Sequence, residues 1–204
     1  ACLFTACKET EEDSTINEPA PICDMLTQDT DYTVVIPSDY TKTEEYSAKQ
    51  ICSYFEEITG ENMDFVVDSQ MALTTDSTYI SLGDTSLFES AEKEHGDVDL
   101  SEATLNADGF YIFTYGKSVF INAYNDRGIM YGAFEFIENT LGVKFLTNDY
   151  TYVPKSNSII LKEYDKSYAP LFKQRTYLNT AVDRDDVEYT AHMCYNTDYG
   201  ELPD

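Results

Sequence analysis

The sequence has little of what most catalytic or metal-binding sites require. It has two histidines, no tryptophan, and five cysteines without a C-x-x-C pair, so no residues stand at the spacing of a zinc site or a disulfide framework. The motifs G-x-S-x-G, H-E-x-x-H, G-x-G-x-x-G and the P-loop are absent too. We therefore predict no catalytic residue, no bound metal and no cofactor in this chain. Because no run of about 18 apolar residues occurs, we also expect no transmembrane helix.

Basic residues are scarce as well. The chain has 13 Lys and Arg against 38 Asp and Glu, which gives a net charge of −25 and a pI near 4.1. Such a polyanion repels nucleic acid and anionic membrane surfaces, and this excludes nucleic acid as a partner. Acidity of this kind is typical of an exported or surface protein that must stay in solution, and it names no substrate.

A few polar residues could still form a site. We interpret His95 and His192 as solvated surface residues rather than ligands. Four acids lie close together near the end of the chain, but neighbouring exposed acids do not differ in environment as the two carboxyls of a glycosidase must. They also lack the glycine and terminal glutamate of a calcium loop, so we interpret them as solvated charge, with weak divalent-ion binding as the alternative. These acids are Asp183, Asp185, Asp186 and Glu188.

The stretch 125–146 carries the clearest structural pattern. Its apolar residues share one sector of a helix at about 100° per residue, and Asn125 or Asp126 suits the N-cap while Gly142 suits a left-handed C-terminal position. Gly128 and Gly132 lie at the edge of the polar sector and indicate close approach of another backbone, unless they are merely tolerated. The apolar residues are Ile129, Met130, Ala133, Phe134, Phe136, Ile137 and Leu141, and the polar sector holds Arg127, Tyr131, Glu135, Glu138 and Asn139.

The chain in order predicts an α+β fold. A strand at 32–36, a helix from Thr43 to Gly60 and a strand at 63–67 form a βαβ unit. Further strands are expected at 79–82, at 109–114 and 118–123 as a hairpin, at 143–146, and as short extended pieces at 151–153 and 158–161. A short helix at 86–95 and an acidic surface loop at 96–108 lie between them. The resulting order, β-α-β-β-β-β-α-β, predicts a mixed sheet with two long helices packed on one face.

Both ends of the chain differ from this middle part. Residues 1–31 resemble the end of a bacterial lipoprotein signal, with Cys7 as the lipidated residue, followed by an acidic linker; the alternative is a cysteine in a frayed terminus. Residues 32–168 form the expected domain. Residues 169–204 are interpreted as a connection toward a further domain, with a strand possible at 176–178, or as a disordered tail.

Exposed aromatic residues are a second resource for function. Tyrosine rings stack on sugar rings, and their hydroxyl groups form hydrogen bonds. Tyr131, Tyr150 and Tyr152 are the candidates for such contacts. The alternative, which we favour at this point, is that they complete the edge of the core.

Several motifs together carry a resemblance to a known family. They are A-x-x-I-x-x-Y-F-x-x-I-T-G at 48–60, Y-I-S-L-G at 79–83, D-G-F-Y-I at 108–112 and R-G-I-M-Y-G-A-F-E-F-I-E-N-T-L-G-V-K-F at 127–145. Over about residues 32–175 the chain resembles the amino-terminal α+β domain of bacterial glycoside hydrolases of the α-glucuronidase and β-N-acetylhexosaminidase type, and related exported proteins.

The resemblance implies a role that is not catalytic. In that family this domain precedes a TIM barrel that carries the catalytic acids, and about 250 residues of barrel do not fit in the 29 residues after Arg175. The segment P-L-F-K-Q-R at 170–175 resembles the approach to the first strand of that barrel, where such enzymes place an arginine that can contact substrate, so the resemblance implies Arg175 as the candidate substrate contact. We therefore expect an accessory domain of an exported, lipid-anchored glycoside hydrolase at the bacterial cell surface, with carbohydrate and its own downstream catalytic domain as partners and the membrane reached by the lipid anchor alone. The alternative is a stand-alone surface module that binds carbohydrate or protein.

Overall fold

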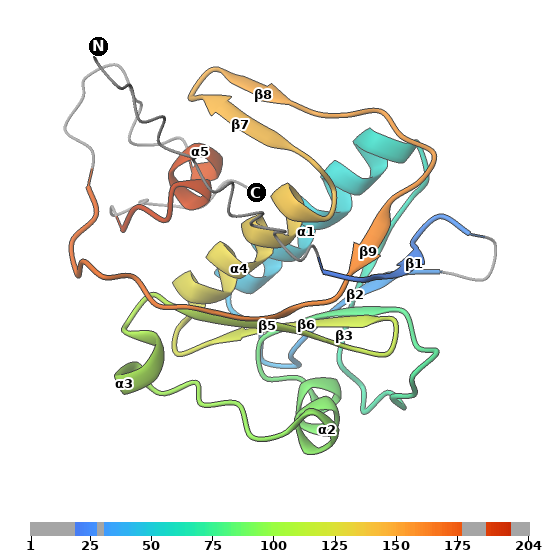
Figure 1. Cartoon of the computed structure of the whole chain (residues 1–204), viewed down its shortest axis with the longest axis horizontal. Helices are drawn as coiled ribbons and strands as arrows, with labels where there is room; N and C mark the ends of the chain where they lie inside the picture. Colours follow the sequence, from blue (N-terminus) through green and yellow to red (C-terminus); the bar gives the residue numbers. More distant parts are fainter. Residues whose placement is uncertain (1–18, 28–30, 177–186, 197–204) are drawn as a thin grey trace, which may run out of the picture.

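A six-stranded mixed sheet is the centre of the fold (Figure 1). The computed structural model describes residues 19–27, 31–176 and 187–196. Within them, the strand order of this sheet is β10-β5-β6-β4-β2-β3. β2, β3, β4 and β6 run parallel, while β5 is antiparallel to β6 and β10 is antiparallel to β5. The strands are β2 Thr33–Ile36, β3 Phe65–Val67, β4 Tyr79–Leu82, β5 Phe110–Tyr115, β6 Ser118–Ala123 and β10 Asp165–Tyr168.

Helices cover both faces of this sheet. The two long helices, α1 (Lys42–Thr59) and α4 (Asp126–Asn139), pack together on one face, as predicted, and confirm the α+β class. The shorter α2 (Ser86–His95) covers the opposite face (Figure 1). Side chains alternate along a strand, so Val34 of β2 packs under the long helices while Val35 packs under α2. The second helical layer was not part of the sequence prediction.

The start of α1 differs from the prediction by two residues. Thr41, not Thr43, is the N-cap: its hydroxyl accepts from Glu44 N at 3.2 Å, and Glu44 Oε2 accepts from Thr41 N at 2.7 Å. This reciprocal capping box satisfies two backbone donors that a helix start leaves unpaired. The helix ends at Gly60, which has φ of 76° as expected for a left-handed C-terminal residue.

The helix predicted within residues 125–146, α4, is largely as predicted. The Asn125 side chain accepts from Gly128 N at 3.1 Å and caps α4, and all seven residues of the predicted apolar sector are buried. Gly142 has φ of 79°, although the last helical turn closes at Thr140. A side chain at Gly128 would collide with the Gly109 carbonyl, and one at Gly132 with Ile121 of β6. The two glycines thus let α4 approach the sheet closely.

Several elements lie where the sequence indicated none. The expected N-terminal linker contains β1 (Pro21–Asp24), which pairs with β9 (Ile160–Lys162), and the expected surface loop contains α3 (Glu102–Leu105). The strand predicted at 143–146 does not join the main sheet. It forms β7 (Lys144–Thr147), which pairs only with β8 (Tyr150–Tyr152) among the described strands.

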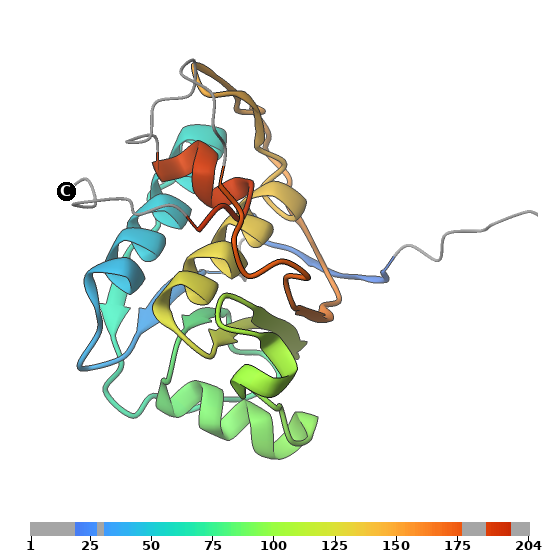
Figure 2. The same ribbon diagram turned by 90° about the vertical axis from the view of Figure 1, so that its left-hand side faces the viewer.

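Part of the polar sector of α4 is also covered, which the sequence did not predict. A short helix, α5 (Val187–His192), packs on α4 and contributes buried Val187 and Ala191 to the main core. Figure 2 shows α5, in red, outside the α1 and α4 layer and on the side away from the sheet. None of the helices in the described ranges is long and apolar enough to span a membrane.

Candidate functional site

A cluster of three polar side chains joins the C-terminal part of the described structure to the start of β5. Arg175 Nη2 donates to Asp108 Oδ2 at 2.9 Å, and Asn196 Nδ2 donates to the same carboxylate oxygen at 3.1 Å. The Asn196 side chain also accepts from Arg175 N at 2.7 Å. We call Asp108, Arg175 and Asn196 the Arg175 clamp.

The residues of the clamp come from three segments that lie outside the helices and strands. Asp108 lies between α3 and β5, Arg175 lies after β10, and Asn196 lies after α5. Arg175 Nε donates to Cys194 O at 2.6 Å and Arg175 Nη1 to Phe172 O at 2.7 Å. The guanidinium therefore ties both the segment before it and the segment after α5 to the start of β5.

The ion pair in the clamp is nearly removed from solvent. The side chains of Arg175 and Asp108 keep 12% and 8% of their surface exposed, and Arg127 Nη1 lies 3.9 Å from the other Asp108 oxygen. Burial is the largest single influence on the pKa of Arg175 and lowers it, but the hydrogen bond to Asp108 and the charges of Asp108, Tyr131 and Tyr168 together raise the net pKa. Two cations thus compensate the charge of a buried carboxylate that the sequence analysis placed in a surface loop.

Tyr131 also belongs to this region and is not available to a sugar. Its ring is buried, its centroid lies 6.0 Å from the Arg175 guanidinium carbon, and its hydroxyl donates to Tyr195 O at 2.7 Å. The favoured interpretation, that this tyrosine completes the edge of the core, therefore holds for Tyr131, because α5 and the residues after it cover that side of α4. Tyr150 and Tyr152, in contrast, are exposed on β8.

Beside the clamp, two large apolar side chains project into solvent. Leu171 is 93% exposed and Phe172 is 73% exposed. The chain is fixed on both sides of them, since Pro170 is buried with its carbonyl accepting from Asn106 Nδ2 at 3.0 Å, and Arg175 is held in the clamp. A cavity of about 440 Å³ lies between this segment and α3, and Phe172, Lys173 and Arg175 are among its lining residues.

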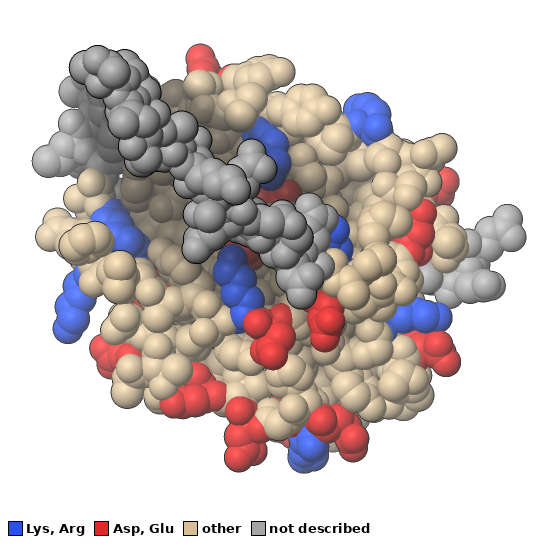
Figure 3. Space-filling view, viewed as in Figure 1, with Lys and Arg blue, Asp and Glu red and all other residues tan. Residues whose placement is uncertain are grey.

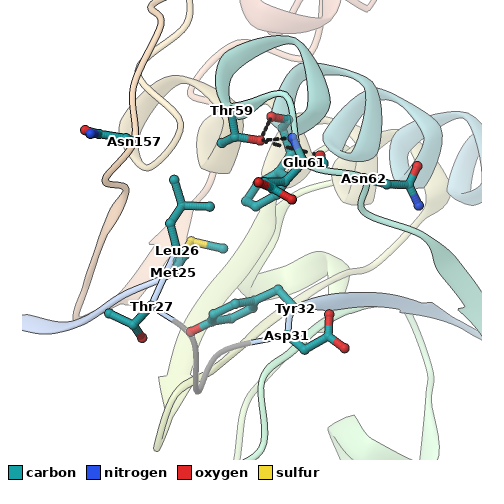
Figure 4. Close-up of a pocket in the computed structure, with 10 residues that line it drawn as sticks. Met25, Leu26, Thr27, Asp31, Tyr32, Thr59, Glu61, Asn62 and Asn157 are labelled. Carbon is teal, nitrogen blue, oxygen red and sulfur yellow. Dashed lines mark hydrogen bonds between the residues drawn. The ribbon is translucent and has the colours of Figure 1, made fainter.

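A second cavity, of about 580 Å³, lies between β1, β2 and the end of α1 (Figure 4). Figure 4 shows Asp31 on the Tyr32 side and Glu61 on the α1 side of this pocket. Much of its polar wall serves the end of the helix, because Thr59 Oγ1 accepts from Glu61 N at 3.0 Å and donates to Phe55 O at 2.8 Å. These contacts are those of a helix terminus, and they define no reacting pair of groups.

Both histidines are packed on aromatic rings, so the prediction of solvated surface residues is wrong. The His95 ring stacks on Phe113 with centroids 4.3 Å apart, and the His192 ring stacks on Phe145 at 5.2 Å. His192 Nδ1 also lies 2.5 Å from Glu138 Oε2. Each histidine therefore fixes a helix end against the domain.

The remaining predicted site residues are the lipidation candidate, the acidic cluster near the end of the chain, and Arg175 as a substrate contact. Cys7 and the acids Asp183, Asp185 and Asp186 lie outside the described residues, so lipidation stays a prediction. Glu188 accepts from Tyr54 Oη at 2.7 Å, and so holds α5 to α1. A substrate contact by Arg175 also stays a prediction; its Nε and both Nη atoms already donate within the chain.

Metal and thiol chemistry find little support in the described part of the chain. No group of three or more His, Cys, Asp or Glu side chains there could hold a metal ion. Cys23, Cys52 and Cys194 are free thiols. Burial raises the pKa of Cys52 to about 12 and that of Cys194 to about 11, so both stay protonated at neutral pH.

Sequence reasoning missed Asp108 and Asn196 as members of the clamp. Asp108 does stand in the D-G-F-Y-I motif, directly before a buried strand, and a conspicuous acid at that place was the available signal. Nothing local marks Asn196, because its partners are far away in sequence.

The fold and the clamp together define a class: an α+β module whose C-terminal segment is fixed to its sheet by a buried ion pair. The model of the family described as the N-terminus of glycosyl hydrolase family 67 matches residues 27–136, more than half of the 204 residues. The chain belongs to this family. It is thus an N-terminal domain of glycoside hydrolase family proteins, as the sequence motifs indicated.

A solved structure described as a GH138 enzyme targeting pectin rhamnogalacturonan II is similar to this chain, with 22% sequence identity and a TM-score of 0.41. The similarity covers 72% of this chain and 14% of that one. No curated protein matches.

Proposed function

We propose that this chain is the non-catalytic accessory domain of an exported, lipid-anchored glycoside hydrolase, and that it supports a catalytic barrel elsewhere in the parent protein. Membership in a family of glycoside hydrolase N-terminal domains supports this proposal most directly. Carbohydrate is then the substrate of the parent enzyme, and this domain contributes stability rather than chemistry.

The segment beside the clamp provides the contact surface. Leu171 and Phe172 are largely exposed between two fixed points, and exposure of large apolar side chains is unfavourable unless a partner covers them. The rigid clamp keeps them in one position, which lowers the entropic cost of binding. We assign this pair as the place where the catalytic domain packs.

Comparison of the isolated chain with the parent protein tests the proposal. The parent should hydrolyse a panel of aryl glycosides, and the isolated chain should hydrolyse none of them. In the parent, the double variant Leu171→Ala/Phe172→Ala should lower the temperature of inactivation by several degrees, with kcat/KM at 25 °C little changed. Tyr40→Ala, at a residue 40% exposed elsewhere on the domain, is the matched control and should change neither.

Two results would contradict the proposal. Turnover by the isolated chain would make the domain itself an enzyme. An inactivation temperature that the double variant leaves unchanged would mean that no catalytic domain rests on Leu171 and Phe172.

Lipid anchoring is a separate part of the proposal and has its own test. Cys7 follows the apolar and small residues that precede the modified cysteine in bacterial lipoproteins. Expressed with its native leader in a bacterial host, the protein should enter the detergent phase on phase separation, and Cys7→Ala should return it to the aqueous phase. Cys23→Ala is the control; identical partitioning of wild type and Cys7→Ala would refute the anchor.

A further inference from the structure

The β7–β8 hairpin presents an aromatic outer face. Its register places Lys144 opposite Tyr152 and Phe145 opposite Thr151. Because side chains alternate along a strand, buried Phe145 faces the helices while Leu146, Tyr150 and Tyr152 face outward, 58%, 57% and 48% exposed. We call Lys144, Leu146, Tyr150 and Tyr152 the hairpin platform.

The platform is held rigidly although it lies outside the main sheet. The Phe145 ring packs edge-on against Tyr54 of α1 at 5.8 Å, against Phe134 of α4 at 5.4 Å and on His192 of α5 at 5.2 Å between centroids. One side chain thus anchors the hairpin to three helices. The strands that carry the outward rings are thereby held in place before any ligand arrives, which reduces the cost of ordering the backbone on binding.

The charge of this face differs from that of the rest of the molecule. The chain carries a net charge of −25, yet the hairpin from Lys144 to Tyr152 contains a single acid, Asp149, at its turn. Asp149 Oδ1 accepts from Thr147 Oγ1 at 2.5 Å. Figure 3 shows mostly uncharged side chains over β7 and β8 and many acids along the opposite edge, over α2 and α3. A ligand on the platform is therefore not selected by strong charge.

Two tyrosine rings on one strand face suit a sugar chain. Residues at positions i and i+2 of a strand lie about 6–7 Å apart on the same face, so Tyr150 and Tyr152 are placed to contact neighbouring sugar units. Their rings offer apolar faces to sugar C–H groups, and their hydroxyl groups offer hydrogen bonds at the rim. A protein partner would need a larger surface, since a standard interface uses about 20–30 residues a side.

We propose that the hairpin platform is a carbohydrate-binding site, on which Tyr150 and Tyr152 stack against a neutral polysaccharide chain. The site is distinct from the Leu171–Phe172 surface and does not depend on a catalytic domain. Membership in a glycoside hydrolase domain family makes carbohydrate the ligand class that such a domain meets. The site would keep the protein on an extended substrate while hydrolysis proceeds elsewhere.

Affinity gel electrophoresis of the 204-residue chain with neutral soluble polysaccharides tests this site. At least one glucan, xylan or mannan should retard the chain. Tyr150→Ala and Tyr152→Ala should each weaken the apparent affinity about three- to tenfold, as expected for the loss of one stacked ring, and the double variant should abolish retardation. Tyr150→Phe should keep most of the affinity, because the stacking face remains.

Tyr124→Ala is the matched control, because Tyr124 is 51% exposed, like the platform tyrosines, but lies outside the platform between β6 and α4. Its retardation should equal that of the wild type, and all variants should unfold at the wild-type temperature because the changed side chains are exposed. The proposal is overturned if no polysaccharide retards the chain, or if the Tyr150 and Tyr152 variants migrate like Tyr124→Ala. It is also overturned if they instead weaken the attachment of a catalytic domain in the parent, since the platform is then a protein interface.

Discussion

The family-matched part of the chain and its C-terminal segment are stabilised in different ways. Residues 27–136 hold most of the apolar core between the sheet and its helices. The C-terminal segment, residues 169–176 and 187–196, adds only Val187 and Ala191 to the buried core among its described residues. It is otherwise held by partly buried packing of Tyr189, His192 and Cys194 and by many polar contacts. Examples are Tyr54 Oη donating to Glu188 at 2.7 Å and Tyr131 Oη donating to Tyr195 O at 2.7 Å.

The two kinds of contact contribute differently to the free energy of folding and to the position of the C-terminal segment. Apolar burial contributes about 25 cal/mol per Å² without regard to direction, so it supplies the free energy of the fold. Hydrogen bonds contribute about 1 kcal/mol each but require defined geometry. We infer that the core gives the domain its stability, whereas the polar contacts fix the position of the C-terminal segment and of the apolar residues it displays.

The largest effect should come from the core. Phe136→Ala removes a fully buried ring of α4 and should lower the free energy of global unfolding by about 3–5 kcal/mol, through lost transfer free energy and the cavity left behind. Chemical denaturation followed by circular dichroism measures this. Leu146→Ala, on the exposed platform, is the control and should change it by less than about 0.5 kcal/mol. Similar values for the two variants would show that α4 is not the centre of a cooperative core.

The next effect should be local and should come from the clamp. Arg175→Met keeps the apolar stem but leaves Asp108 buried beside a more distant Arg127, and breaking a buried pair costs about 3 kcal/mol. Hydrogen exchange should then show lost protection at residues 187–196 with protection in β4 and β6 retained. The double variant Arg175→Met/Asp108→Asn should regain part of the lost protection at residues 187–196, because no unpaired carboxylate remains. Uniform loss of protection over the sheet would mean that the two regions unfold as one.

The same contrast explains what could be predicted from the sequence. Periodicity of apolar residues predicted α4, α1 and the sheet strands from β2 to β6, because burial acts on residues close in sequence and repeats every 3.6 or 2 positions. It could not give β10 or α5, whose positions depend on distant partners such as Tyr111 for Asp165 and Glu138 for His192. It also could not show that Tyr131 is covered, because a helix pattern does not reveal what packs on its outer side.

The close approach of α4 to the sheet gives a smaller effect. Gly128→Ala should lower the free energy of unfolding by about 1–2 kcal/mol, since the new methyl group meets the Gly109 carbonyl and Ala123, and overpacking of this kind costs more than the gain of about 1 kcal/mol in helix propensity. Thermal unfolding measures it. Ser53→Ala, at an exposed position of α1, gains helix propensity without such a collision and serves as the control. A more stable Gly128→Ala variant would mean that the glycine is merely tolerated.

Glu44 gives the smallest expected effect. It is a buried charged residue within the family-matched part of the chain, residues 27–136, whose core is otherwise mostly apolar. Burial raises the pKa of this carboxyl above its ordinary value of 4.5, and the charges of Asp126 and Asp84 add to the rise, although its hydrogen bonds to Thr41 oppose it. The unfolded chain releases this proton at a lower pH than the folded domain does. At pH values above 4.5 the ionised carboxyl therefore reduces the stability of the folded domain. The penalty is absent below pH 4.5, grows as pH rises through the raised pKa, and is constant beyond it.

Glu44→Gln tests this assignment. The amide oxygen keeps the capping-box acceptor for Thr41 N, while no charge is buried. The variant should be more stable than the wild type at pH 7, by less than the roughly 1 kcal/mol of a lost helix cap, and the difference should vanish as pH falls below 4.5. Denaturation curves at several pH values measure this. A variant less stable than the wild type at pH 7 would show that the ionised carboxylate stabilises the start of α1, and that polar groups contribute free energy in the core region as well as placement.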